Sequence, residues 1–216
     1  MSIRLAGLLF LIAAAPLDAQ QDVAARLAGR VPPEVVALVQ QLAAEAAARG
    51  LPVDPLIQKA IEGGAKGVPP DRVATAVRAV VARLDVAAAA LRQGGLARPD
   101  TDAIAAGAFA VSAGLSGTQI AELARTGDSR YGAAVTLRVA GTLAALGVPA
   151  AEILALVDAT IRAGRPPSEL LELPGRVQGE VARGATPAQA AAGLARAAAA
   201  AGRGGPPPRR GPPDRP

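Results

Sequence analysis

The sequence predicts an all-α protein built from paired helical hairpins. Hydrophobic residues make up 51% of the chain, mostly as Ala, Val and Leu, whereas aromatic residues make up only 1%. Strands favour aromatic and β-branched side chains that alternate with polar ones, and no segment shows that alternation. The pattern Gly-x-Pro recurs between stretches of helical apolar spacing, which is typical of one helix ending and the next beginning. We therefore expect hairpins packed side by side as a bundle or a short solenoid, with a disordered C-terminal tail.

Residues 1–19 predict a secretory signal peptide. Arg4 supplies a positive charge, Leu5 to Ala15 form an apolar run of 11 residues, and Leu17-Asp18-Ala19 offers a cleavage site after Ala19. An uncleaved anchor is the alternative, but an apolar run of this length is too short to cross a bilayer. The chain contains no cysteine, which excludes disulfides and argues against a lipid-anchored lipoprotein. We expect a periplasmic or secreted bacterial protein.

Residues 20–94 predict the N-terminal helical hairpins. Each expected helix shows apolar side chains at helical spacing, and glycine and proline mark its ends. Asp54 is expected as the N-cap of the third helix, ahead of a proline in the first turn. The first expected helix is a weak one from Val23 to Leu27, and the second runs from Pro32-Pro33 to about Arg49. The third runs from Asp54-Pro55 to Gly67, and its apolar face holds Leu56, Ile57, Ala60, Ile61 and Gly64. The fourth begins at Pro69-Pro70-Asp71, and its apolar stripe holds Val73, Val77, Val80, Val81, Leu84 and Leu91.

Residues 100–202 predict the C-terminal helical hairpins, which we expect to form one globular unit with residues 20–94. Residues 103–121 carry no charge over 19 positions, so a membrane span has to be weighed. Three glycines, two serines, Thr118 and Gln119 make this segment too polar for insertion. The first expected helix is capped by Asp100 or Thr101, and a turn at Gly114–Gly117 separates it from a second short helix. The next two helices are expected from Gly127-Asp128-Ser129 to Gly147 and over residues 147–164. A further helix begins at Pro166-Pro167 and should be kinked or split by Pro174, and Thr186-Pro187 opens the last one.

An offset of 97 residues, from 50 to 147, aligns two of these hairpins. It pairs Gly50 with Gly147 and Gly67 with Gly164, with prolines at matching positions after each glycine. The match indicates an internal duplication, or only the capping chemistry that any helix–Gly–Pro–helix sequence shares. Both interpretations remain open.

Lys59, Glu62 and Lys66 are predicted to share the polar face of the third helix, because they follow one another at helical spacing. These two lysines are the only ones in the chain. One interpretation is a contact with an anionic partner or another subunit, and the other is a solvated face with ion pairs inside the helix. We take the three residues as the candidate interaction face.

The segment from Pro55 to Pro70, with the pattern P-L-I-x-K-x-x-E-G-x-A-K-G-V-P-P, resembles a segment of uncharacterised secreted helical proteins of bacteria. The resemblance covers about one hairpin. It implies a secreted helical class, and it implies no mechanism, cofactor or site residue.

The residue types present leave little room for catalysis. The chain has no histidine and no cysteine, which excludes zinc sites built from them, and we expect no metal and no cofactor. Residues 63–67 are glycine-rich but lack the strand and the Lys-Ser/Thr pair of a phosphate loop. Outside residues 1–19 the aromatic side chains are Phe109 and Tyr131 alone, which is a poor supply for a sugar site. We expect a non-catalytic interaction or scaffold protein of the cell envelope, and the alternative is a carboxylate-dependent hydrolase acting on the cell wall.

Residues 203–216 predict a disordered, partly polyproline II tail. This stretch holds a net charge of +3, whereas the whole chain has a net charge of +5, so the remainder is close to neutral and nucleic acid is not expected as a partner. The tail is a candidate site for an anionic envelope polymer or an envelope protein, or it is only a solubilising segment. Its charged residues are Arg203, Arg209, Arg210, Asp214 and Arg215.

Overall fold

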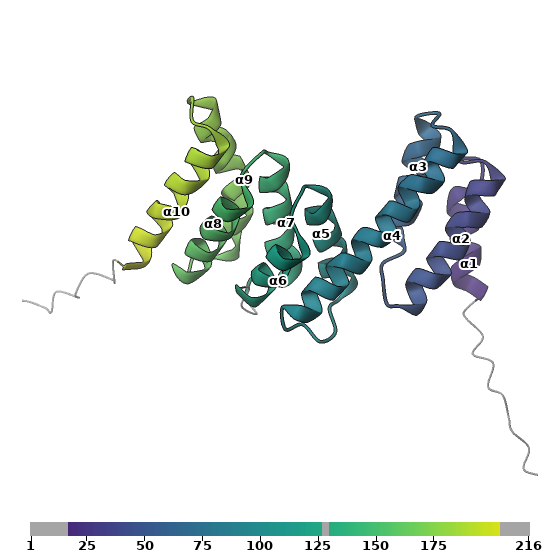
Figure 1. Cartoon of the computed structure of the whole chain (residues 1–216), viewed down its shortest axis with the longest axis horizontal. Helices are drawn as coiled ribbons and strands as arrows, with labels where there is room; N and C mark the ends of the chain where they lie inside the picture. Colours follow the sequence, from purple (N-terminus) through teal and green to yellow (C-terminus); the bar gives the residue numbers. More distant parts are fainter. Residues whose placement is uncertain (1–16, 127–129, 204–216) are drawn as a thin grey trace, which may run out of the picture.

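The computed structural model describes residues 17–126 and 130–203, and within these ranges the chain is all-α (Figure 1). This confirms the predicted fold class. The helices are α1 (Leu17–Leu27), α2 (Pro33–Ala48), α3 (Asp54–Ala65), α4 (Pro70–Gln93), α5 (Thr101–Ser112), α6 (Gly117–Thr126), α7 (Ala133–Ala145), α8 (Ala150–Arg162), α9 (Pro167–Ala182) and α10 (Pro187–Arg203).

Glycine and proline set the helix boundaries, as the sequence predicted. Gly50 and Gly67 follow α2 and α3 with φ values of 71° and 62°, a left-handed conformation that glycine adopts without strain. Pro69 is the N-cap residue of α4. The side chain of Asp100 caps α5, because its Oδ1 accepts a hydrogen bond from the Ala103 amide at 2.7 Å. The capping chemistry of these residues is local, so it is readable from the sequence.

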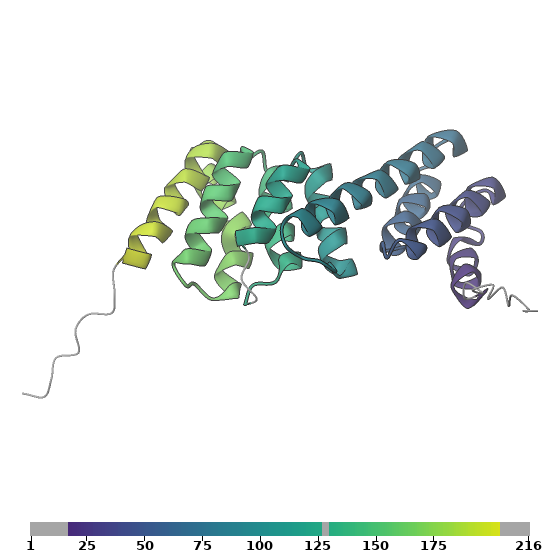
Figure 2. The same cartoon turned by 60° about the horizontal axis from the view of Figure 1, so that its bottom comes forward.

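From α4 onwards the helices form two adjacent rows. One row contains α5, α7 and α9, the other contains α4, α6, α8 and α10, and within each row a helix packs against the next. Figures 1 and 2 show the result as an elongated stack that runs from α1 and α2 at one end to α10 at the other. Packing of each helix against the next but one is the arrangement of a short solenoid.

The stacking is interrupted between α3 and α5. Both helices pack on α4, which at 24 residues is the longest of the described helices, but they do not pack closely on each other. At one end α4 contacts α2 and α3, and at the other it contacts α5 and α6. The long helix therefore bridges an opening in the row, and this opening positions the candidate site.

Small side chains let the helices approach closely. The buried apolar residues form one cluster that extends from Val23 in α1 to Ala191 in α10. Leu56, Ile57 and Ala60, which were predicted to share a face of α3, are all fully buried. Where α5 crosses α4, a Cβ atom on Gly107 would lie 2.9 Å from the Cβ atom of Ala87, so this contact depends on a glycine.

Two boundaries in the N-terminal half were predicted wrongly. The first helix begins at Leu17 and not at Val23. Asp54 is the first residue of α3 and not its N-cap, which is Val53. The Asp54 carboxylate instead accepts a hydrogen bond from Arg26 Nη1 at 2.6 Å. A contact with α1 has therefore replaced the local cap.

Three features of the C-terminal half also differ from the prediction. The helix expected from Gly127-Asp128-Ser129 begins at Ala133, after Gly132 at φ 70°, and residues 127–129 themselves lie outside the described ranges. Of the two outcomes predicted for Pro174, a kink or a split, the split is wrong, because α9 continues from Pro167 to Ala182. Arg203, assigned to the tail, is the last residue of α10. The rest of the predicted tail and the predicted signal peptide up to residue 16 lie outside the described residues.

The two hairpins aligned at an offset of 97 share local structure but not packing. Gly147 and Gly164 have φ values of 82° and 66°, close to those of Gly50 and Gly67. However, α3 packs mainly on α4, whereas α8 packs mainly on α10. An internal duplication stays a prediction.

None of the helices within residues 17–126 and 130–203 has the length and apolar character that crossing a membrane requires.

Candidate interaction groove

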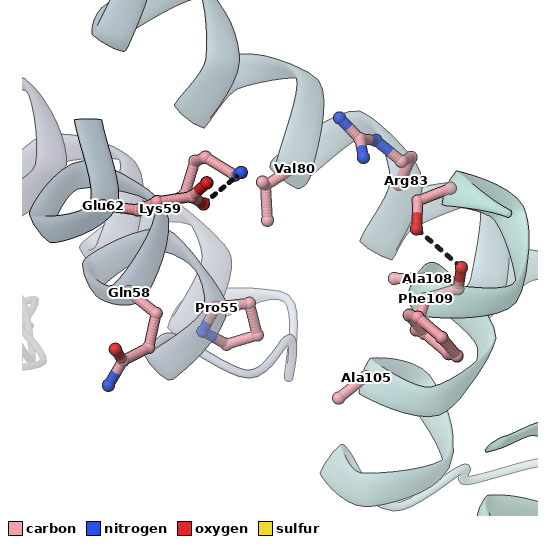
Figure 3. A pocket seen from close by; sticks show the side chains of 10 residues that line it. Pro55, Gln58, Lys59, Glu62, Val80, Arg83, Ala105, Ala108 and Phe109 are labelled. Carbon is pink, nitrogen blue, oxygen red and sulfur yellow. Dashed lines mark hydrogen bonds and ion pairs between the residues drawn. The ribbon is translucent and has the colours of Figure 1, made fainter. Parts of the chain in front are cut away.

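A groove lies between α3 and α5, with α4 as its floor (Figure 3). We call it the α3–α5 groove. It exists because α3 and α5 contact the same long helix without contacting each other closely. The groove encloses about 380 Å³, and its lining residues are Pro55, Gln58, Lys59, Glu62, Val80, Arg83, Ala105, Ala108, Phe109 and Ser112.

The α5 wall of the groove is apolar and includes an exposed aromatic ring. Phe109 is 42% exposed, and in Figure 3 its ring lies beside Ala105 and Ala108 on the same wall. Its position is fixed from behind, since a Cβ atom on Gly141 of α7 would lie 2.7 Å from Phe109 Cδ1. Large apolar side chains left exposed beside a concave surface mark binding sites more often than plain surface.

The α3 wall carries two residues of the predicted interaction face. Glu62 accepts hydrogen bonds from Lys59 Nζ and Lys66 Nζ, each at 2.5 Å, so the three predicted residues do come together. Lys59 and Glu62 line the groove, whereas Lys66 lies beside it and does not. The hydrogen bonds and charges of the two lysines lower the pKa of Glu62 from 4.5 to about 2. Glu62 is therefore ionised at neutral pH and is unsuited to donate a proton as a general acid.

Arg83 brings a second cation to the groove from α4. Its Nε donates a hydrogen bond to the Ala79 carbonyl oxygen at 3.1 Å, and it forms no ion pair with any carboxylate of the described residues. Figure 3 shows its guanidinium on the same side of the groove as Phe109. Because Lys59 is paired with Glu62, Arg83 supplies the net positive charge of this part of the groove, which we call the basic end.

The groove continues towards the start of α3 and α5, where it becomes acidic. A second hollow shares Pro55, Gln58 and Ala105 with the first, and Asp54 and Asp102 line it. Both aspartates lie in the first turn of their helices, next to each helix's positive N-terminal end. We call this part the acidic end. A linear ligand in the groove would thus meet two carboxylates at one end, and Arg83 beside the Lys59–Glu62 pair at the other.

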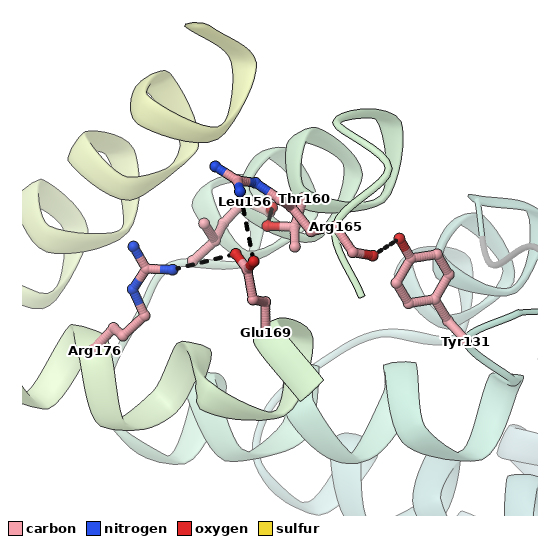
Figure 4. Close-up of polar contacts among 6 residues, drawn as sticks. All are labelled: Tyr131, Leu156, Thr160, Arg165, Glu169 and Arg176. Atoms are coloured by element: carbon pink, nitrogen blue, oxygen red, sulfur yellow. Dashed lines mark hydrogen bonds and ion pairs between the residues drawn. The ribbon is translucent and has the colours of Figure 1, made fainter. Parts of the chain in front are cut away.

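A second cluster of charged residues, around Glu169, has a structural explanation (Figure 4). Tyr131 donates its hydroxyl hydrogen bond to the Arg165 carbonyl oxygen, which ties the segment before α7 to the α8–α9 turn. Glu169 lies 3.5 Å from Arg165 Nη1 and 3.9 Å from Arg176 Nη1. The adjacent cavity encloses only about 60 Å³, which holds one or two waters. This cluster connects helices and offers no room for a ligand.

Sequence reasoning found one wall of the groove and missed the other. It identified Lys59 and Glu62 but not Arg83 or Phe109, because their proximity depends on how α4 and α5 pack. The one available signal was the rarity of aromatic side chains, since the whole chain has only two phenylalanines. Among the predicted tail residues, Arg203 is an exposed residue at the end of α10, and Arg209, Arg210 and Arg215 lie outside the described residues.

Within the part of the chain that the structure describes, no three acidic residues are grouped so that they could hold a metal ion. Comparison of the chain with protein families, with curated proteins and with solved structures finds no match. The groove is therefore the basis for inferring a function.

Proposed function

We propose that this protein is a non-catalytic interaction or scaffold module of the bacterial cell envelope, and that it binds a partner segment in the α3–α5 groove. The observation that carries the proposal is Phe109, an aromatic side chain 42% exposed in an opening between helices that otherwise stack in contact. The proposed location rests on the signal peptide that residues 1–19 predict.

The composition of the groove suits a binding surface. Interfaces are enriched in aromatic side chains and arginine, and a few such residues dominate the binding energy. The groove presents one of each, Phe109 and Arg83, and the methyl groups of Ala105 and Ala108 let a partner backbone come close. Removing an aromatic anchor typically costs about 2 kcal/mol of binding energy. We therefore expect Phe109→Ala to weaken partner binding at least tenfold, since about 1.4 kcal/mol is one decade.

Photo-crosslinking in intact cells tests this proposal. A photoreactive amino acid replaces Gln58, an exposed residue of the groove, or Gln178, an exposed residue of α9 outside it. We expect a defined crosslinked species from position 58 that Phe109→Ala removes. The matched control Leu171→Ala, which truncates an apolar side chain 56% exposed on α9, should retain it. Equal capture at both positions, or capture that Phe109→Ala leaves unchanged, contradicts the proposal.

A cell-wall hydrolase is the second candidate, and one observation favours it. Asp54 and Asp102 line the same hollow at the acidic end of the groove, and glycoside hydrolysis needs two carboxylates that face one cleft. Incubation of the purified protein with cell-wall polymer separates the candidates. Release of soluble fragments that Asp54→Asn or Asp102→Asn abolishes would replace the non-catalytic proposal, which expects no release.

A further inference from the structure

We propose that the α3–α5 groove binds residues 204–216 of a second copy of this chain, so that copies associate head to tail. The inference rests on the proposed function, because both place the binding surface in the same groove. It goes further by naming the occupant.

The composition of the segment matches the apolar part of the groove. Residues 204–216 read GGPPPRRGPPDRP and contain six prolines. Such a sequence favours polyproline II, and segments of this kind bind in grooves with an aromatic wall, because little conformational entropy is lost on binding. Phe109 and Pro55 supply the ring surfaces of the groove, and Val80 supplies its floor.

The order of charges along the segment matches the order along the groove. Arg209 and Arg210 precede Asp214, which Arg215 follows, and the four steps from Arg210 to Asp214 would span about 12 Å in polyproline II. In the groove, Asp102 lies seven residues before Phe109 on α5, which is about 10 Å along a helix.

Arg83 lines the groove together with Phe109. The segment can therefore place Arg210 at the acidic end while Asp214 reaches Arg83 at the basic end. Neither Asp102 nor Arg83 has an ion-pair partner among the described residues, so both can pair with the segment without breaking an existing pair.

The segment has to come from a second copy because its own chain is too short to reach. Arg203 ends α10, at the opposite end of the stack from α3 (Figures 1 and 2). Arg210, which is placed at the acidic end, follows Arg203 by seven residues, and in polyproline II these seven steps would span about 22 Å. The three steps from α10 to α8, from α8 to α6 and from α6 to α4, the floor of the groove, amount to about 24–30 Å at the usual helix spacing. A tail-to-groove contact between copies is heterologous, so it generates open chains or rings.

The test measures binding of a fluorescent peptide with the sequence of residues 204–216 to the protein that lacks only these residues. We expect saturable binding that Phe109→Ala weakens at least tenfold, and that Leu171→Ala leaves within twofold. A charge swap then tests the register. Asp214→Lys in the peptide should weaken binding to the unaltered groove, and Arg83→Glu in the protein should restore it.

The protein with residues 204–216 should in addition show a mass that rises with concentration in sedimentation velocity, whereas the protein without them should stay a monomer. No saturable peptide binding, equal binding to Phe109→Ala, or failure of the charge swap overturns the inference. The inference is also overturned if the protein with residues 204–216 is a monomer at every concentration and does not bind the added peptide. In that case residues 204–216 would occupy the groove of their own chain.

Failure of this inference is distinguishable from failure of the proposed function. If the photo-crosslink at position 58 persists in cells after residues 204–216 are removed and is still lost in Phe109→Ala, the groove binds another partner and only the inference falls. If position 58 captures nothing in either protein, both fall.

Discussion

The substitution Gly64→Ala tests how closely α3 approaches the turn between α1 and α2. A Cβ atom at this position would lie 2.2 Å from the Arg30 carbonyl oxygen and 2.8 Å from Val31 Cγ1. Carbon and oxygen atoms normally stay at least about 3.3 Å apart, so the backbone of the turn must move by about 1 Å. Overpacking of this kind costs about 1–3 kcal/mol. We take the upper end because the obstacle is a backbone atom and not the tip of a flexible side chain.

Alanine also has a higher helix propensity than glycine, which offsets about 1 kcal/mol. We therefore expect Gly64→Ala to lower the free energy of unfolding by about 2 kcal/mol. The matched control is Gly175→Ala in α9, where an added Cβ atom meets nothing within 4 Å, and which should stabilise the protein by about 0.5–1 kcal/mol. Urea denaturation followed by circular dichroism at 222 nm measures both. A Gly64→Ala protein that is as stable as Gly175→Ala would refute the close approach.

Two further predictions concern helix ends and charge. Asp100→Ala should lower the free energy of unfolding by about 1 kcal/mol in the same urea assay, because it removes the side-chain cap on the Ala103 amide. The pKa of Glu62 is lowered from 4.5 to about 2, so carbon-13 NMR of the side-chain carboxyl groups should show this residue titrating below its ordinary range. In the double variant Lys59→Ala/Lys66→Ala, the midpoint of the Glu62 titration should move back towards 4.5. Because the pKa is lowered on folding, the stabilisation from this cluster is present above pH 4.5 and is lost as the pH falls towards 2.

Each of these has a control. Asp71→Ala, which removes an acid from the first turn of α4 where no side chain caps the helix, should cost only about 0.3 kcal/mol from the helix dipole, and an equal loss in both variants would contradict the capping role of Asp100. For the titration, an unchanged Glu62 midpoint in the double variant would show that the lysines do not control its ionisation.

Most of the fold could be predicted because its boundaries depend on local chemistry. Glycines such as Gly50 and Gly67 end helices through a backbone conformation that other residues avoid, and Asp100 caps the helix that begins next to it. Where a boundary depends on a distant residue, the prediction was wrong. Asp54 pairs with Arg26 of α1 and leaves the cap position to Val53, and no pattern around Asp54 reveals that contact.

The candidate site was only partly predictable for the same reason. The spacing of Lys59, Glu62 and Lys66 fixes their common face, and the structure confirms it. Phe109 lies in the uncharged stretch of residues 103–121, which in a sequence indicates burial, yet it is exposed because α3 does not pack closely against α5. Arg83 belongs to the polar side of α4, and it lines a groove because that helix extends past two different neighbours. Both positions follow from the spacing between helices, which apolar periodicity does not encode.

Adjacent glycines in α3 illustrate the same limit. Residues 63–67 are glycine-rich without the rest of a phosphate loop, and the structure explains two of these glycines by packing. A Cβ atom on Gly63 would lie 2.6 Å from Val73 Cγ2, and one on Gly64 would meet the Arg30 carbonyl oxygen. The pair lets α3 approach α4 on one side and the α1–α2 turn on the other.

Occupancy of the α3–α5 groove in the cell can be measured directly. The chain contains no cysteine, so a single cysteine at Gln58 in the groove, or at Gln178 outside it, is the only thiol of this protein that a small maleimide can label. If the groove binds a partner, Gln58→Cys should react several-fold more slowly in intact cells than in the purified, dilute protein, whereas Gln178→Cys should react equally in both. Equal reaction rates of Gln58→Cys in cells and in dilute solution would mean that nothing covers the groove, and would contradict the account.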